Sequence, residues 1–463
     1  MRRFSTLGQR TGYAAGVASG LPGWVKVAYG GGAVGWVLID RIVITWLYTY
    51  YVTSEGDAGE PLVLPLVFGA VMFGGRVIDA IADPLIARLS DNHRGRLGRR
   101  LPFMLTSGVL YVAVYAALFH PPAAFGPVGH AVYLGVLLGA YFTLFTAYVG
   151  PYLALMADLS RQRRDRVDLA TSKAVATLAG SGIGLIASGP LVAALGVRGM
   201  VVALGLAALV LLYVPGAIPE RRYARAEPAT MALVPAVRAT FANRPFLVAL
   251  VGINALWFAF NLVTINIPLY VTSLLGLSEE MMALVMGAVF GVALVVFPAA
   301  NILAKRWGLK RAMILSLALF AATFPVVAIL GWAPPGLTPL QFAMIGLGLT
   351  GIPLAGFFIV PDTLIATVAD LDTRRTGQRR EGMYFGVQGL VLKLNLGVST
   401  LVSGGLLQWF GDPLGIRLTG VVAAVVLALG ALALTRYPEA EVEAERAALP
   451  GVGAEAVDPV GTE

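Results

Sequence analysis

The feature that most constrains the fold of this chain is a series of strongly apolar runs that repeats along its length. Each run is close to the ~20 residues that an α-helix needs to cross a lipid bilayer. Charged residues make up only 13% of the 463 residues, and the mean hydropathy is +0.78, whereas about a quarter of a typical soluble domain is charged. The sequence lacks the short alternating segments of a membrane β-barrel. It therefore predicts an all-α membrane protein.

The charge of the connecting loops indicates twelve transmembrane helices. The predicted spans are 28–52, 62–90, 101–120, 128–157, 170–195, 199–217, 246–275, 280–303, 312–332, 337–369, 383–410 and 414–436. Basic loops follow every second span, whereas Arg198 and Arg417 are the only Lys or Arg residues in the alternate loops. Because Lys- and Arg-rich loops stay in the cytoplasm, both termini are predicted to be cytoplasmic.

A polar segment near the middle of the chain divides these spans into two groups of six. We expect a cytoplasmic N-terminal segment (1–27), an N-terminal six-helix half (28–217), a cytoplasmic central loop (218–245), a C-terminal six-helix half (246–436) and a cytoplasmic acidic tail, mostly disordered (437–463). The halves resemble each other weakly, since "LSDNHRGRLGRRLPFML" follows the second span and "LAKRWGLKRAMIL" follows the eighth. A parallel repeat of this kind is typical of a six-plus-six transporter.

The second predicted span contains three charges on one face. Asp79 and Asp83 are four residues apart, and Arg76 lies three residues before Asp79. Because each charge near the middle of a bilayer costs about 2.5–3.5 kcal/mol, this face is predicted to line the interior of the helix bundle or a water-filled cavity.

This group has three possible roles. Two carboxylates and one guanidinium leave an excess of negative charge, which favours a bound cation such as Na⁺, coordinated by oxygen ligands. A proton shared by Asp79 and Asp83 would serve equally well. In the third interpretation, Arg76 neutralises one aspartate and the group is structural only.

The same stretch resembles a motif of a known family. "RVIDAIADPLIARLSDNHRGRLGRRLPF" is similar to the second-helix signature of the glycoside–pentoside–hexuronide:cation symporters of the major facilitator superfamily. "VKVAYGGGAVG" (25–35) resembles the opening motif of that family, and "ADLDTRRTGQRREGMYFGVQGLVLKLNLG" (369–397) resembles its segment between helices ten and eleven. The resemblance implies a major facilitator fold and symport of a sugar or glycoside with Na⁺ or H⁺ by alternating access.

The resemblance also implies roles for individual residues. Asp79, Asp83 and Thr146 match the cation-binding positions, with Na⁺ held at Asp79 and Asp83. Lys393 matches a lysine near the cation site, and it is the only charge in its predicted span, so it is either a partner of the carboxylates or a substrate contact. Lys173 matches a basic residue that reaches the sugar pocket, although it could instead extend toward the headgroups from a helix end.

The sequence departs from the family in the sugar pocket. Val37 and Val149 replace two acidic residues that contact the sugar, and Leu153 replaces a stacking tryptophan. Asp40 could replace a lost carboxylate or could pair with Arg41 or Arg76. Ala82 replaces an asparagine of the cation site, which leaves the choice between Na⁺ and H⁺ open.

Other polar residues inside apolar spans are candidates for the substrate pocket. They are Asp362, Trp257, Asn261 and Gln388. Asp362 follows Pro361, which predicts a local break in the helix. Trp257 and Asn261 could equally hold helices together, which is the commoner use of such residues in membranes.

The basic loops are predicted to act as a cytoplasmic gate. Arg94, Arg99 and Arg100 lie after the second span, and Arg379 and Arg380 lie before the eleventh. The resemblance implies ion-pair latches at these positions, although basic loops could also serve topology alone.

Several functional classes are excluded or left as alternatives. The chain has no cysteine, and His93, His120 and His130 fall in loops or at helix ends, so we expect a transporter without cofactors and not an enzyme. The net charge of +8 reflects the basic loops and not a nucleic-acid partner. We expect a monomer in a cell (inner) membrane that transports a small molecule. The alternatives are a cation-coupled symporter for an amphiphile such as a lysophospholipid and a non-transporting assembly factor.

Overall fold

The computed structural model describes residues 21–53, 61–159, 163–223, 240–357, 360–376 and 381–448. Regular structure in these residues is helical, apart from one isolated bridge between Gly95 and Gly98. Eleven helical segments among them are long and apolar enough to cross a membrane. The longest, Asp168–Ala217, has 50 residues and contains two of the predicted spans, since the helix is broken at Gly196, where φ is 70°. The prediction of an all-helical membrane protein is confirmed.

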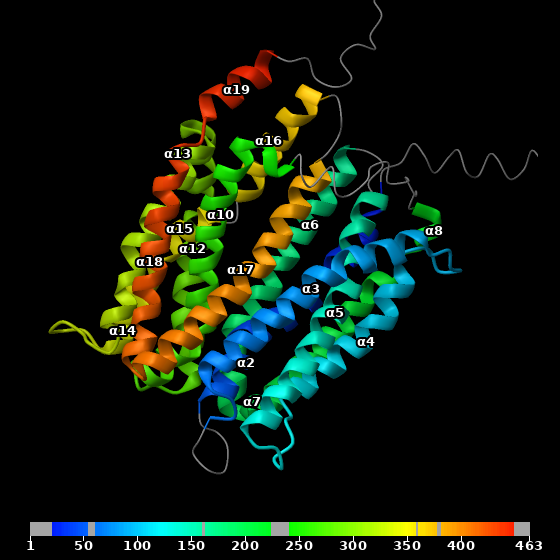
Figure 1. Cartoon of the computed structure of the whole chain (residues 1–463). Coiled ribbons are helices and arrows are strands. Elements are labelled where there is room, and N and C mark those ends of the chain that lie inside the picture. The colour runs from blue at the N-terminus through cyan, green and yellow to red at the C-terminus, as the bar shows by residue number, and fades with distance from the viewer. Residues whose placement is uncertain are drawn as a thin grey trace, which may run out of the picture.

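The N-terminal half is the blue-to-green part of Figure 1. Its elements are α2 (Gly23–Val52), α3 (Pro65–Asn92), α4 (Leu101–Leu118), α5 (Pro127–Leu159), α6 (Arg163–Gly182), the π-helical turn η1 (Ile183–Ala187), α7 (Ser188–Tyr213), the 3₁₀ turn η2 (Val214–Ala217) and α8 (Glu220–Tyr223). Proline lies in the first turn of both α3 and α4, where its missing N–H would have no partner within the helix.

The C-terminal half repeats this pattern with more interruptions. Its elements are α10 (Arg244–Ile265), α11 (Ile267–Leu269), the π-helical turn η3 (Tyr270–Leu274), the 3₁₀ turn η4 (Glu279–Met281), α12 (Met282–Trp307), α13 (Leu309–Thr323), the 3₁₀ turn η5 (Phe324–Ile329), α14 (Pro339–Gly348), α15 (Gly351–Phe357), α16 (Val360–Thr376), α17 (Glu381–Phe410), α18 (Leu414–Leu434) and α19 (Glu439–Ala448). The predicted span 337–369 is therefore formed by three successive helices.

Part of the acidic tail is ordered, contrary to the expectation of disorder there. Helix α19 follows α18, and its Val442 side chain is 2% exposed. The carboxylate of Glu439 accepts a hydrogen bond from the backbone N–H of Lys310 at 2.8 Å. An apolar anchor and a carboxylate bond thus hold α19 against the bundle, while the remaining tail lies outside the described residues.

The two halves pack tightly at the end of the bundle opposite to the basic loops, here called the closed end. Helices α3 and α17 lie along each other across the middle of the molecule (Figure 1). A Cβ atom on Gly404 would lie 2.2 Å from the backbone oxygen of Pro65, and one on Gly69 would lie 2.6 Å from Leu401 Cα. Only glycine permits such an approach of two backbones, so the closed end depends on these glycines.

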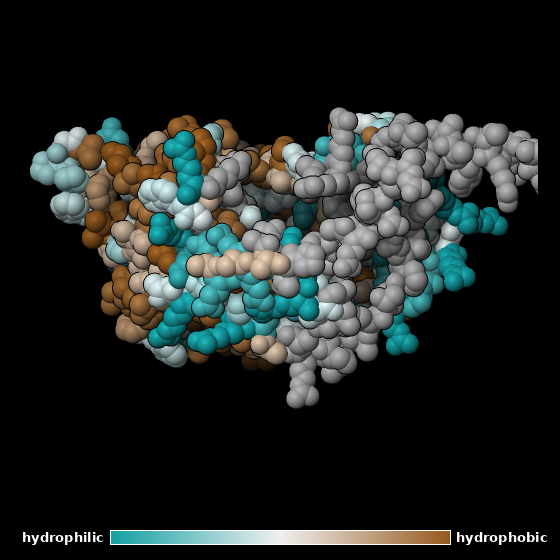
Figure 2. Space-filling view, turned by 90° about the horizontal axis from the view of Figure 1, so that it is seen from above, coloured by the Kyte–Doolittle hydropathy of each residue, from teal (hydrophilic) through white to brown (hydrophobic). Residues whose placement is uncertain are grey.

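The other end, here called the basic end, carries the loop 93–100 and helices α8 and α19. Figure 2 shows this face, where hydrophilic side chains gather beside a hollow in the surface. The ion pairs of the described residues at this end, such as Arg99–Asp158 and Arg375–Glu445, each join groups of the same half. The halves are therefore packed together at the closed end and are not latched by these ion pairs at the basic end.

Candidate functional site

Three charged residues of α3, Arg76, Asp79 and Asp83, face the interior of the protein. The outer face of this helix contains Ile81 and Leu85, each 59% exposed. Asp83 is two residues from both, and about 100° of rotation per residue places it on the opposite side of the helix. Its side chain is nevertheless 40% exposed. Asp83 therefore faces an open space on the protein side of α3, as the cost of burying charges in lipid predicts.

The hydroxyl of Thr146 lies between the two carboxylates. Its Oγ1 is 2.5 Å from Asp79 Oδ1 and 3.0 Å from Asp83 Oδ1. A threonine hydroxyl has one proton, so it donates to one carboxylate at a time. Helix α5 thus contributes an oxygen at the position that the resemblance implied.

Lys393 links the C-terminal half to this group. Its Nζ donates to Asp79 Oδ1 at 2.9 Å and to both oxygens of Asp83 at 2.7 and 2.8 Å. These are the ion pairs that cross between the halves among the described residues. Of the two roles left open for Lys393, the structure contains the pairing with the carboxylates.

The negative charges of this group are balanced by positive ones: three carboxylates (Asp40, Asp79, Asp83) lie beside three cations (Arg41, Arg76, Lys393). Arg76 lies 3.2 Å from Asp79 and 3.8 Å from Asp40, and Asp40 also pairs with Arg41 at 2.9 Å. The excess of negative charge inferred from Arg76 and the two aspartates is therefore absent here, because the ammonium of Lys393 supplies the second positive charge. Neutrality matters because uncompensated charge is costly in a weakly polar environment.

Two aromatic rings border the cations. The guanidinium of Arg76 lies 4.1 Å from the centre of the Phe142 ring, and Lys393 Nζ lies 5.9 Å from the centre of the Phe145 ring. Cation–π attraction strengthens where water is excluded. Both phenylalanines belong to α5, so this helix provides oxygen and ring contacts to the same group.

The structure pairs Asp40 with arginines, which is one of the alternatives considered for it. Asp40 is 6% exposed and bonded to Arg41. Of the positions where the sequence departs from the family, Val37 and Val149 are buried, whereas Leu153 is 40% exposed. The position of the stacking tryptophan is thus an exposed apolar side chain in this protein.

Lys173 and Asp362 come from different halves. Lys173 is half-buried on α6, and Asp362 is exposed in the first turn of α16. No ion pair within 4.0 Å joins them among the described contacts, so a gap remains between two opposite charges.

The remaining pocket candidates are packed within the C-terminal half. The Trp257 ring lies 4.7 Å from the ring of Phe357, centre to centre. Asn261 is 3% exposed and Gln388 is 4% exposed. The burial of Asn261 and the packing of Trp257 are compatible with the role of holding helices together that the sequence left open for them.

Two of the predicted gate residues, Arg99 and Arg100, have partners within their own half. Arg99 binds both oxygens of Asp158 at 2.9 and 2.8 Å, and Arg100 binds Asp158 at 3.1 Å. Arg94 is exposed. Arg379 and Arg380 lie outside the described residues. In this conformation, Arg99 and Arg100 hold the ends of α4 and α5 together.

Sequence reasoning missed two carboxylates of the basic end. Glu220 accepts hydrogen bonds from the backbone N–H groups of Arg99, Arg100 and Leu101 at 2.7 to 3.0 Å, at the start of α4. Glu439 has the equivalent position beside α13. The signal was present, because a Pro-Glu pair follows the sixth predicted span of each half.

The group contains the oxygen ligands that a monovalent cation or a proton would need. No cluster of three or more His, Asp or Glu side chains that could hold a metal is found among the described residues. Two carboxylates and a hydroxyl are oxygen ligands for a hard cation, and a carboxylate pair can also bind a proton. Lys393 takes up the carboxylate bonds that such a ligand would need.

Comparison with known proteins finds several symporters among the relatives of this chain. An uncharacterized symporter of Synechocystis sp. (strain ATCC 27184 / PCC 6803 / Kazusa) is 24% identical, with 88% of this chain and 90% of the relative aligned. YagG of Escherichia coli (strain K12), whose name assigns it to the glycoside/cation symporters, is 29% identical over 43% of each chain. A sodium-dependent lysophosphatidylcholine symporter of Xenopus tropicalis is 30% identical over 28% of this chain and 25% of its own.

The fold is shared with a solved transporter structure. The crystal structure of a D-xylose–proton symporter superposes with a TM-score of 0.65 at 15% identity, over 90% of this chain and 98% of that chain. The family model described as MFS/sugar transport protein matches residues 28–438. The predicted resemblance is confirmed: this multi-pass membrane protein is a symporter that belongs to the MFS/sugar transport family.

Proposed function

We propose that the protein is a cation-coupled symporter of a sugar or glycoside that works by alternating access, with Na⁺ or H⁺ as the coupling ion. The observation that carries this proposal is the group formed by Asp79, Asp83 and Thr146 of one half and Lys393 of the other. A cation site that is shared between the two moving halves can couple its occupancy to their relative position.

The proposed topology has twelve spans with both termini in the cytoplasm of a cell (inner) membrane, and the protein acts as a monomer. The break at Gly196 supports it, because the 50-residue segment then counts as two spans. The grouping of basic loops at one end supports the orientation. The described conformation is then closed toward the outside and open toward the cytoplasm.

Coupling would follow from competition between Lys393 and the cation. Na⁺ or H⁺ at Asp79 and Asp83 removes the negative charge that holds Lys393. The released ammonium can then donate hydrogen bonds to a hydroxyl of the substrate. Because each ligand favours the arrangement that the other needs, cation and substrate bind with positive cooperativity.

The group also disfavours states in which only the cation or only the substrate is bound. With Lys393 released and no substrate bound, an ammonium in a weakly polar space has no partner, which is unfavourable. When the substrate is bound and only the cation is absent, the two negative carboxylates remain and bind Lys393. The fully loaded and fully unloaded states are therefore the ones that are stable enough to reorient, as symport requires.

The test is a comparison of two Asp→Asn variants. Asp83→Asn removes one carboxylate of the site, and Asp412→Asn makes the same change at an exposed turn after α17. Each protein is reconstituted and screened by thermal shift and uptake with sugars and lysolipids, in Na⁺ and in choline, and with a pH gradient. We expect Asp83→Asn to lose cation-dependent uptake while it remains folded, and Asp412→Asn to keep it. Coupled uptake at the wild-type level in Asp83→Asn would refute the site.

One alternative substrate class has its own support. The similarity to a lysophosphatidylcholine symporter over 28% of the chain and the exposed Leu153 in place of a stacking aromatic both favour an amphiphile. In the same screen, stabilisation by lysolipids and not by sugars would select this alternative while leaving the cation mechanism in place.

A further inference from the structure

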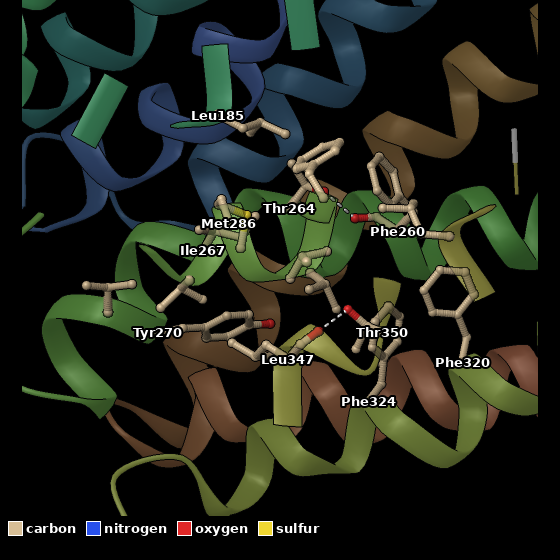
Figure 3. A pocket seen from close by; sticks show the side chains of 16 residues that line it. Leu185, Phe260, Thr264, Ile267, Tyr270, Met286, Phe320, Phe324, Leu347 and Thr350 are labelled. Carbon is tan, nitrogen blue, oxygen red and sulfur yellow. Dashed lines mark hydrogen bonds between the residues drawn. The ribbon is translucent and has the colours of Figure 1, made fainter. Parts of the chain in front are cut away.

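The C-terminal half contains an apolar cavity that is separate from the charged site. Its volume is about 50 Å³, and it lies between α10 with η3, α12, α13 with η5, and α14 with α15 (Figure 3). Leu185 of η1 is the lining residue that belongs to the N-terminal half, and it lies across the cavity from Tyr270 and Leu347 (Figure 3). The cavity is thus completed only when the two halves are together at this level.

The polar groups of the cavity already have partners. Thr264 Oγ1 donates to the Phe260 carbonyl at 2.7 Å, and Thr350 Oγ1 donates to the Leu347 carbonyl at 2.6 Å. The hydroxyl of Tyr270 is 2.7 Å from that of Thr419. A water molecule or a sugar hydroxyl would find few free partners here and would lose hydrogen bonds on entry. The cavity therefore suits an apolar group.

The helices around the cavity are irregular. Both π-helical turns among the described elements, η1 and η3, contribute to its lining, through Leu185 and through Tyr270 and Val271. A π-helical turn is rare and is found frequently at functional sites. A cavity also forfeits packing contacts for the side chains around it, so a cavity in a folded core needs a reason.

One side chain lies between the cavity and a residue that the sequence suggests for the substrate pocket. Phe260 lines the cavity, and its ring lies 6.1 Å from the Trp257 ring and 4.8 Å from the Phe357 ring, centre to centre. Trp257 is a candidate for the substrate pocket. A molecule bound beside Trp257 could therefore extend an apolar group past Phe260.

We infer that the cavity binds a short alkyl group of the transported molecule, which makes an alkyl glycoside, and not a free sugar, the preferred substrate. This inference rests on the proposed symport of a glycoside. A volume of about 50 Å³ corresponds to roughly four water-sized groups, at about 10–15 Å³ each. The cavity takes a chain of about four carbons, and it is too small for the long acyl chain of a lysophospholipid.

The binding test uses methyl, butyl and hexyl β-D-galactosides and β-D-glucosides with the full-length protein in lipid nanodiscs, in Na⁺ and in choline. Burial of each methylene group should tighten binding about fourfold, so the affinity should rise steeply from methyl to butyl and level off by hexyl. Affinity is obtained from the concentration dependence of the thermal shift.

Two matched variants place this effect at the cavity. Val289→Phe fills the cavity from α12, and Val295→Phe makes the same change on the same helix at a side chain that is 79% exposed. We expect Val289→Phe to bind the methyl glycoside with the affinity of the wild type and to lose the increase in affinity from the butyl chain. Val295→Phe should keep this increase. If Val289→Phe does not fold, Leu354→Ala enlarges the same cavity and should move the plateau beyond hexyl.

Each outcome is decisive. Equal affinities for methyl and butyl glycosides, or a butyl gain that survives in Val289→Phe, would overturn the inference while leaving the symporter intact. Butanol tests whether bilayer hydrocarbon occupies the cavity instead. If butanol stabilises the protein as much as the butyl chain does, and Val289→Phe abolishes this effect, the inference is overturned in favour of bilayer hydrocarbon as the occupant. If neither methyl glycoside stabilises the protein in any cation, the proposed function fails, and the inference fails with it.

Discussion

Replacing Gly404 with alanine should move the protein away from the conformation described here. Gly404 lies on α17 at the closed end, where its Cα faces the first turn of α3. An added Cβ would lie 2.2 Å from Pro65 O, 2.7 Å from Pro65 C and 3.2 Å from Leu66 Cα. These are backbone atoms, which no change of side-chain rotamer can move, so α3 and α17 must separate by roughly 1 Å to restore an ordinary contact.

The expected magnitude follows from the cost of overpacking. Inserting a methyl group into a well-packed contact costs about 1–3 kcal/mol. Gly404→Ala pays this cost only while the halves are packed at the closed end, because the same methyl faces open space once they separate there. The equilibrium between the two conformations should therefore shift by a factor of roughly 5 to 160 toward the state that is open at this end.

The natural chain has no cysteine, which makes the shift directly measurable. Spin labels attached to Val128→Cys, at the start of α5, and to Leu337→Cys, before α14, report the separation of the halves at the closed end. We expect Gly404→Ala to populate a longer distance. Gly389→Ala, on the same helix with nothing within 4 Å of the added Cβ, should leave the distribution unchanged.

The reasoning would be refuted by one clear result. If folded Gly404→Ala gives the same distance distribution as the wild type and Gly389→Ala, the contact of α17 with Pro65 does not control closure. A uniform loss of stability, without a change in the distance distribution of the folded protein, would have the same meaning.

Three other predictions concern charges. Lys393→Met leaves Asp79 and Asp83 without the ammonium group that they share, so it should destabilise the protein by about 1–3 kcal/mol in choline. Thermal unfolding should show that Na⁺ restores this stability. A loss of stability that is the same in Na⁺ and in choline would contradict the competition between Lys393 and the cation. Glu220→Ala removes the acceptor of three backbone N–H groups and should cost about 1–3 kcal/mol, whereas Glu220→Gln should cost less in the same denaturation assay. The hydrogen bond from Arg375 lowers the pKa of Glu445. The stability from this contact is therefore present above the ordinary carboxyl range and is lost as pH falls through the lowered pKa. Proteolysis of the tail should accelerate over that pH range, and Glu445→Gln should abolish the pH dependence.

The sequence by itself determined the class of the protein and most of its helices. Apolar runs of helical length and the alternation of basic loops depend on the cost of placing charge and unpaired backbone in lipid, and this cost acts on each segment independently of its neighbours. For the same reason, the sequence indicated correctly that Arg76, Asp79 and Asp83 face inward. The resemblance then placed Thr146 and Lys393 near them, where the structure has both.

Only the tertiary structure decided how these charges are balanced. Lys393 is 310 residues from Asp83 along the chain, and no local pattern shows that its ammonium fills the space between the two aspartates. The pairing of Asp40 with Arg76 and the bonds of Glu220 at the start of α4 likewise depend on contacts between distant segments.

The tight packing at the closed end and the apolar cavity were also decided only by the tertiary structure. Glycines are frequent throughout this chain, with 55 in total. The sequence does not distinguish Gly404, where an added Cβ would meet the backbone of α3, from Gly389, where it would meet nothing within 4 Å. The cavity arises where helices of the C-terminal half fail to fill the space beside Leu185 of the other half. The sequence determines which segments enter the membrane, because that is a property of each segment. Packing decides how the charges are balanced, which backbones touch and where a cavity remains, because these depend on pairs of segments.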